Sequence, residues 1–148
     1  MSLETRIMPD LKEAMRNKDQ AALRGIRAIK AAILLIKTDG SGKELDEAGE
    51  IKLLQKLVKQ RRDSLEIFVK QGREDLAAVE REEIAVIERY LPKQLDPAEL
   101  EEMLKGIVAD LGASSMKDMG KVMGVASKKL AGKADGKTIS GIIKGLLS

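Results

Sequence analysis

At 148 residues and 16.2 kDa, the chain is long enough for one domain or two small ones, and a hydrophobic content of 43% favours a globular fold. It contains no cysteine and no histidine, which excludes disulfides and zinc–thiolate sites and removes the commonest general base. The net charge is only +3, but residues 116–148 hold seven lysines against two acidic residues, so the basic character is concentrated at this end.

The first 92 residues are predicted to form about four helices, arranged as an antiparallel bundle or a pair of hairpins in an all-α protein. Apolar residues recur there every three or four positions, and glycine or proline separates the segments. Pro9 either kinks the first helix or restarts it with Asp10 as the N-cap. The predicted helices cover residues 3–17, a second segment that has Asp19 as its cap and stops at residues 40–42, and residues 46–71 and 75–91.

Two basic groups in this part are open to two interpretations. Arg24, Arg27 and Lys30 lie one turn apart on one helix, and a solvated face is favoured over a binding strip. Arg61 and Arg62 point about 100° apart on the next helix. An ion-pair network is favoured for them over phosphate binding, with one arginine reaching a carboxylate and the other facing water.

Residues 90–95, Tyr-Leu-Pro-Lys-Gln-Leu, are the best candidate for a domain boundary, because proline disfavours helical geometry in the residue before it. The next helix starts with Asp96 as N-cap and Pro97 at its first position. We therefore predict an N-terminal domain of residues 1–92 and a three-helix C-terminal domain of residues 96–148. Residues 96–115 carry a net charge of −4, and their carboxylates are able to neutralise the basic segment that follows.

The basic segment is predicted to form two short helices that bury methionine, valine and isoleucine and gather their lysines on the outer surface. Gly120 and Gly124 have the spacing that usually lets another helix approach closely. Residues 132–138 are one residue short of the phosphate-loop pattern, and no strand precedes them, so a nucleotide-binding loop is rejected. A glycine linker with Asp135 as helix cap is favoured over a modest phosphate site at the start of the last helix.

No arrangement of residues indicates catalysis. Ser114 and Ser115 near Lys117 lack the surroundings of a serine nucleophile and stand where a helix N-cap is expected, with Asp118 at the third helical position. The carboxylates are spread along helix exteriors without metal-ligand spacing. We therefore expect no catalytic centre, no metal and no cofactor.

Several motifs nevertheless resemble one family. Lys117 to Met123 and Gly132 to Gly136, followed by an apolar helix, resemble the tail domain of the B subunit of glutamyl/aspartyl-tRNA amidotransferase (GatB) and the stand-alone YqeY-like proteins. The segments 59–64, 72–77 and 90–95 are similar to the YqeY pattern in particular. The resemblance implies a helical protein associated with tRNA, and any link to a carbon–nitrogen ligase that uses glutamine would be inherited from the larger enzyme.

Binding is therefore the favoured class of function, through the phosphates of a folded RNA such as tRNA. With one tyrosine, one phenylalanine and no tryptophan, the chain lacks a platform on which bases could stack. The alternatives are a helical module that binds a protein partner, and an accessory component of a glutamine-dependent carbon–nitrogen ligase. The N-terminus and the short apolar runs predict a cytoplasmic protein without a membrane span. The candidate phosphate-binding residues are Lys117, Lys121, Lys128, Lys129, Lys133 and Lys137.

Overall fold

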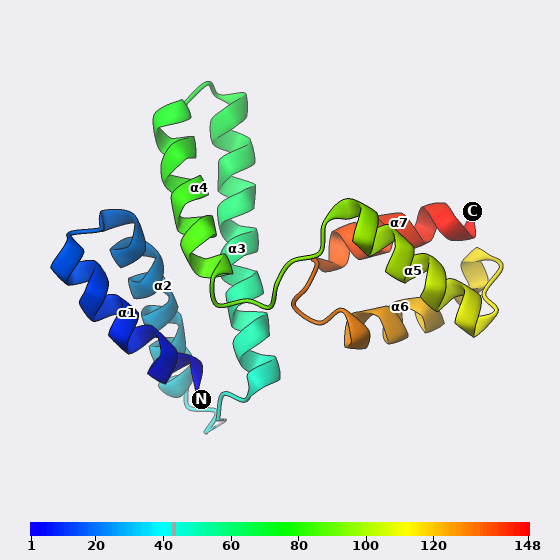
Figure 1. The fold of residues 1–148 in the computed structure, drawn as a ribbon, viewed down its shortest axis with the longest axis horizontal. Coiled ribbons are helices and arrows are strands. Elements are labelled where there is room, and N and C mark those ends of the chain that lie inside the picture. Colours follow the sequence, from blue (N-terminus) through cyan, green and yellow to red (C-terminus); the bar gives the residue numbers. More distant parts are fainter. Residues whose placement is uncertain (43) are drawn as a thin grey trace. The chain divides into compact units, whose positions relative to one another are not determined.

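The structure, a computed structural model, describes residues 1–42 and 44–148, and these residues form helices without a strand. The predicted all-α class is confirmed. In the described part, no helix is both long and apolar enough to cross a membrane. The elements are α1 (Leu3–Asn17), α2 (Gln20–Lys37), α3 (Glu47–Lys70), α4 (Glu74–Glu88), α5 (Pro97–Leu111), the 3₁₀ helix η1 (Met116–Asp118), α6 (Met119–Lys129) and α7 (Gly136–Leu147) (Figure 1).

Aspartate side chains determine where four of these helices begin. In each case the carboxylate accepts a hydrogen bond from the backbone N–H three residues later, which satisfies a group that has no partner inside the helix. The caps are Asp19 on α2 (3.1 Å), Asp46 on α3 (2.7 Å), Asp96 on α5 (2.8 Å) and Asp135 on α7 (2.8 Å).

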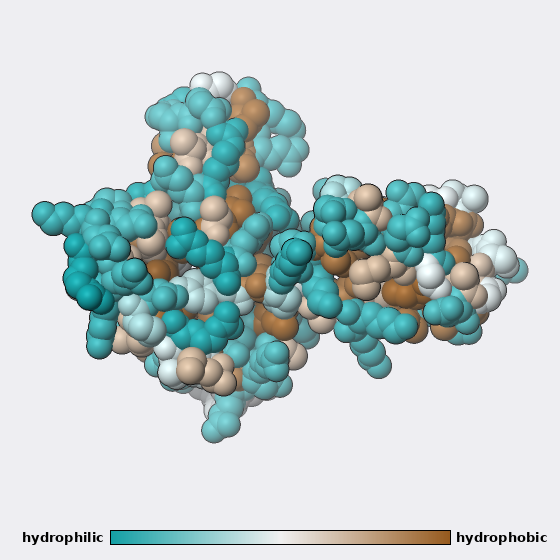
Figure 2. Space-filling model, viewed as in Figure 1, coloured by the Kyte–Doolittle hydropathy of each residue, from teal (hydrophilic) through white to brown (hydrophobic). Residues whose placement is uncertain are grey.

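The chain divides into two compact units, Met1–Leu91 and Pro92–Ser148, each with its own apolar core. In the first unit, α2 packs against α1 and α4, and α4 pairs with α3. The α3–α4 hairpin extends beyond the ends of α1 and α2 (Figure 1). In the second unit, α5, α6 and α7 each contact the other two. On the face shown in Figure 2, hydrophilic residues cover most of each unit, with smaller apolar areas between them.

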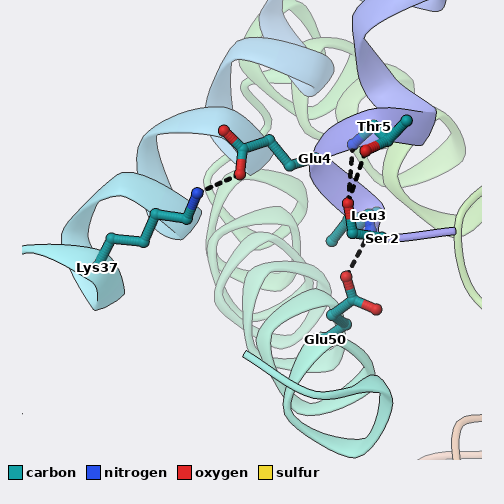
Figure 3. A network of polar contacts seen from close by, with 6 residues as sticks. All are labelled: Ser2, Leu3, Glu4, Thr5, Lys37 and Glu50. Carbon is teal, nitrogen blue, oxygen red and sulfur yellow. Dashed lines mark hydrogen bonds and ion pairs between the residues drawn. The ribbon is translucent and has the colours of Figure 1, made fainter. Parts of the chain in front are cut away.

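Polar contacts at the start of helix α1 and near its middle join it to the rest of its unit. At its start, the Leu3 N–H donates to the Glu50 carboxylate of α3, and Lys37 at the end of α2 pairs with Glu4 (Figure 3). Further along, the Tyr90 hydroxyl donates to the Asp10 carboxylate. Helix α1 runs through Pro9 without a break, so the predicted restart at Asp10 does not occur.

The two arginines of α3 both reach α4. Arg62 lies 2.8 Å from Glu88, and the less exposed Arg61 lies 3.9 Å from Glu83. The predicted ion-pair network is confirmed, although the expectation that one arginine faces only water is wrong. The pKa of the neighbouring Glu80 carboxyl is raised, chiefly by burial and then by the charge of Glu83, against the opposing effect of Arg61.

Glu80→Gln is expected to stabilise the N-terminal unit at pH 7. A raised carboxyl pKa means that the folded protein binds the proton more tightly than the unfolded chain, so wild-type stability falls as the pH rises through the raised value. The free energy of unfolding of the variant should be higher by about 0.2–0.5 kcal/mol. This is the usual cost of like charges one turn apart on a helix, here Glu80 and Glu83. Urea unfolding followed by Tyr90 fluorescence measures this gain, which should shrink at about pH 4, below the ordinary glutamate pKa.

Glu82→Gln is the matched control, because Glu82 lies 2.6 Å from Arg24 in an exposed ion pair. We expect the free energy of unfolding of this variant to fall by between 0 and about 1 kcal/mol at pH 7, because the ion pair is lost. Equal changes in stability for Glu80→Gln and Glu82→Gln would contradict the interpretation that the Glu80 carboxylate is held unfavourably near Glu83.

Candidate nucleic-acid interface

Helix α6 turns two of the candidate lysines away from the core of the C-terminal unit. Val122 and Ala126 are buried on its inner side, and Leu130 is buried just beyond its end. At 100° per residue, the exposed Lys121 and Lys128 lie on the outer side within about 20° of each other. Their Cα atoms are separated by about 10 Å along the helix axis.

Helix α7 repeats this arrangement. Ile139 and Ile143 are buried, while Lys137 and Lys144 are exposed on the outer side, again seven residues apart. Because each helix points its lysines away from the core that both share, the lysines form two short strips on different helices.

The other three candidates lie at the edges of these strips. Lys117 is exposed in η1, and Lys129 is exposed at the end of α6. Lys133 is half-buried in the loop between α6 and α7, where its carbonyl accepts a hydrogen bond from the Leu95 N–H at 3.0 Å. Lys133 is therefore the least accessible of the six predicted binding residues.

The acidic helix α5 does not neutralise these lysines. Within the described residues, no carboxylate lies within 4.0 Å of a lysine nitrogen of residues 116–148, and the ion pair of α5 joins its own Lys105 and Glu101 at 3.6 Å. At the start of α7, the Asp135 carboxylate accepts from the Thr138 N–H and hydroxyl, as the predicted helix cap does. The negative charge of this carboxylate disfavours phosphate binding at the start of α7, where a modest phosphate site was considered.

The surroundings of Gly120 and Gly124 in α6 differ from those predicted. A methyl group added at Gly120 or Gly124 would meet no atom of another segment within 4 Å. The expectation that this pair lets a helix approach closely is therefore wrong within the described part of the chain. The close approach occurs instead at Gly25 of α2, where an added methyl group would lie 2.5 Å from the Val86 side chain of α4.

Gln94, within residues 90–95, stabilises the loop before α7 through two hydrogen bonds. The sequence alone did not predict this role. Gln94 donates through Nε2 to the Pro92 carbonyl at 2.8 Å and to the Gly132 carbonyl at 2.6 Å. Gly132 is buried and has a φ of 76°, a conformation that favours glycine. The segment therefore fixes the connection that carries Lys133.

Gln94→Ala is expected to destabilise the C-terminal unit by about 1–2 kcal/mol, because the buried Gly132 carbonyl loses its donor. Urea unfolding followed by circular dichroism measures the loss. Gln60→Ala is the control, since Gln60 is exposed on α3, and its stability should change by less than about 0.5 kcal/mol. An equal, small effect at both positions would show that the Gln94 contacts do not stabilise the loop.

The serines near Lys117 lie at the start of a helix, as predicted. The Asp118 carboxylate accepts hydrogen bonds from the backbone N–H of Ser114 (3.0 Å) and Ser115 (3.4 Å). Residues 1–42 and 44–148 contain no group of three acidic side chains placed to hold a metal ion.

The fold and surface define an all-α protein of two helical units, with unpaired lysines on the outer sides of two helices of the second. A comparison with known families gives its relationship: residues 4–147 match the family described as Yqey-like protein, so the chain belongs to the YqeY-like family. This confirms the resemblance to YqeY-like proteins seen in the sequence.

Curated relatives carry the name altered inheritance of mitochondria protein 41, mitochondrial. The protein of Kluyveromyces lactis is 36% identical over 138 residues, which cover 91% of this chain and 70% of the relative. That of Lachancea thermotolerans is 36% identical over 72% of this chain and 58% of the relative. That of Vanderwaltozyma polyspora is 32% identical over 74% of this chain and 63% of the relative. The matches thus cover less than two thirds of the last two relatives.

These names contradict the cytoplasmic location predicted from the sequence, because all three relatives are called mitochondrial. The prediction rested on composition and on the first residues. Location depends on targeting segments that are separate from the folded domains, so the helical units carry no information about it.

Proposed function

We propose that this protein is an accessory RNA-binding protein that contacts the phosphate backbone of a folded RNA and has no catalytic centre of its own. The contacts are assigned to Lys117, Lys121, Lys128, Lys129 and Lys137, with Lys133 at the edge. The first candidate for the RNA is tRNA, because the tail resembles the tail domain of the tRNA-dependent amidotransferase B subunit.

One observation carries this proposal: the lysines of residues 116–148 have no carboxylate partner in the described part of the chain. Some exposed lysines elsewhere are paired, as in Lys70–Glu66 (3.4 Å) and Lys105–Glu101 (3.6 Å), whereas none of the tail lysines is paired within the described residues. Ammonium groups without a protein partner are able to neutralise phosphates and displace the counterions condensed on the RNA, and the release of those counterions favours the complex.

The division of the lysines between two helices indicates what kind of anion fits. The assigned lysines are spread over η1, α6 and the start of α7, so a single phosphate would contact few of them. A folded RNA presents many phosphates over a large surface and is able to meet both strips. The near-absence of aromatic residues supports contact with the backbone over base-specific readout.

Charge reversal tests the assignment. We expect Lys117→Glu with Lys121→Glu to weaken binding of a fluorescently labelled tRNA at least tenfold, measured by anisotropy with the full chain at about 50 mM salt. The control is Lys12→Glu with Arg16→Glu, which changes the net charge equally on exposed positions of α1. Equal losses in both variants would show a general charge effect and contradict the assignment to the tail.

A second candidate function, binding of a protein partner, is favoured by one observation. Leu34 and Leu35 near the end of α2 are 60% and 72% exposed. Capture of one protein that is insensitive to salt and lost in Leu34→Ser with Leu35→Ser would support this function over RNA binding.

A further inference from the structure

Helix α3 presents a second line of lysines, in the N-terminal unit. Lys52, Lys56 and Lys59 are exposed and follow the spacing i, i+4, i+7. At 100° per residue they fall within an arc of about 60° and span about 10 Å along the helix axis. Leu54 and Val58 are buried in the core on the other side of the helix.

These lysines have no ion-pair partner within the described residues, although Asp63 lies four residues after Lys59 on the same helix. Residues 51–62 contain three lysines and two arginines but no acidic residue. Arg61 and Arg62 lie near Glu83 and Glu88 of α4, whereas within the described residues no carboxylate lies within 4.0 Å of the three lysine nitrogens. The charge of the α3 lysine strip, defined as Lys52, Lys56 and Lys59, is therefore not compensated by the fold.

The strip reduces the stability of α3. Like charges three or four residues apart on a helix cost about 0.2–0.5 kcal/mol per pair. The second half of the same helix shows the stabilising alternative, where Lys70 pairs with Glu66 four residues before it. An unfavourable row of like charges on a rigid helix is the arrangement expected of a surface that binds an anion.

The surroundings of the strip favour a phosphate polymer over other anions. Attachment to a membrane surface requires large apolar side chains that enter the lipid. The exposed large apolar residues of α3, Ile67 and Val69, lie two or more turns beyond Lys59. Three point charges in line on a straight helix suit a chain of regularly spaced phosphates, and lysine binds phosphate as a point charge.

We propose that the α3 lysine strip is a second contact site for the RNA backbone, so that both units of the protein bind the same RNA. This inference rests on the proposed function and extends it to a surface of the N-terminal unit. The arginines beside the strip contribute to the α3–α4 packing, and the lysines contact the phosphates.

The test is Lys52→Gln with Lys56→Gln and Lys59→Gln in the full chain. Glutamine keeps helix propensity and removes the charge. Binding of labelled tRNA is measured by anisotropy over a series of salt concentrations. We expect affinity at low salt to fall about tenfold, and the slope of log K against log salt to decrease in magnitude by roughly 2 to 3, the change for three lost phosphate contacts.

The matched control is Lys12→Gln with Lys70→Gln and Lys105→Gln, which removes the same charge from α1, from the far end of α3 and from α5. It should keep the wild-type slope. Circular dichroism should show that the strip variant is at least as stable as wild type, because like charges have been removed. A loss of binding then does not come from unfolding.

The outcomes separate this inference from the proposed function. If the strip variant keeps the wild-type affinity and slope while Lys117→Glu with Lys121→Glu loses binding, the inference is wrong and the proposed function stands. If the strip variant alone loses binding, the strip contacts RNA but the tail assignment falls, and the claim that both units bind the same RNA is wrong. Absence of RNA binding by the wild-type chain, or strip-dependent binding to anionic vesicles alone, overturns both.

Discussion

Gly25→Ala is expected to destabilise the N-terminal unit by about 1–3 kcal/mol, although alanine is the better helix former. The added methyl group would lie 2.5 Å from Val86 Cγ1 and 2.7 Å from Val86 Cβ. Real side chains do not approach so closely, so α2 and α4 would have to move apart. Urea unfolding followed by the fluorescence of Tyr90, the protein's one tyrosine, reports on this unit directly.

Two further variants make this prediction specific. Val86→Ala in the Gly25→Ala background should recover part of the loss, because it removes the nearest atom but leaves Cβ in place. Gly141→Ala in α7 meets no atom within 4 Å and should stabilise its own unit by about 0.5–1 kcal/mol. A Gly25→Ala protein as stable as wild type would contradict the close packing of α2 on α4.

Ile143→Ala is expected to have the largest effect on the C-terminal unit. Ile143 is fully buried in the core formed by α5, α6 and α7, and such a truncation costs about 2–5 kcal/mol. A unit that comprises only Pro92–Ser148 has little stability to lose. Circular dichroism should therefore show loss of much of its helical signal at room temperature.

The neighbouring residue provides the control. Ile142 is only partly buried, so Ile142→Ala should cost clearly less than Ile143→Ala. Because the two cores share no buried residue, the Tyr90 transition should be unchanged in Ile143→Ala. Loss of both transitions together would contradict the division into two cores.

Features that depend on nearby residues were predictable from the sequence. The caps Asp19, Asp96 and Asp135 and the all-α class follow from side-chain chemistry and from apolar spacing within a few turns. An ion-pair network of Arg61 and Arg62 was also predicted, but not which helix supplies the carboxylates.

Contacts between residues far apart in the chain were not predictable. The hydrogen bond from Tyr90 to Asp10 joins positions eighty residues apart, and that from Gln94 to Gly132 joins positions thirty-eight apart. No local feature of the sequence distinguishes Gly25, where an added methyl group would clash with Val86, from Gly124, where it would meet no atom within 4 Å. Only the packing of the helices makes that distinction.

The candidate site was predictable in part. Helical spacing correctly placed Lys121, Lys128 and Lys137 on outer sides, but their division between two helices depends on how α6 and α7 pack. The α3 lysine strip has a clear spacing in the sequence. The strip was not predicted, because only Arg61 and Arg62 were considered as possible phosphate-binding residues on that helix.

The salt dependence of tRNA binding by the wild-type chain tests the central claim most directly. If the assigned tail and strip lysines neutralise about five to eight phosphates, log K should fall linearly with log salt, with a slope near −4 to −7. Affinity should then drop by about two to four orders of magnitude between about 50 and 200 mM salt. Undetectable binding at the lower concentration, or a slope near zero, would contradict the account.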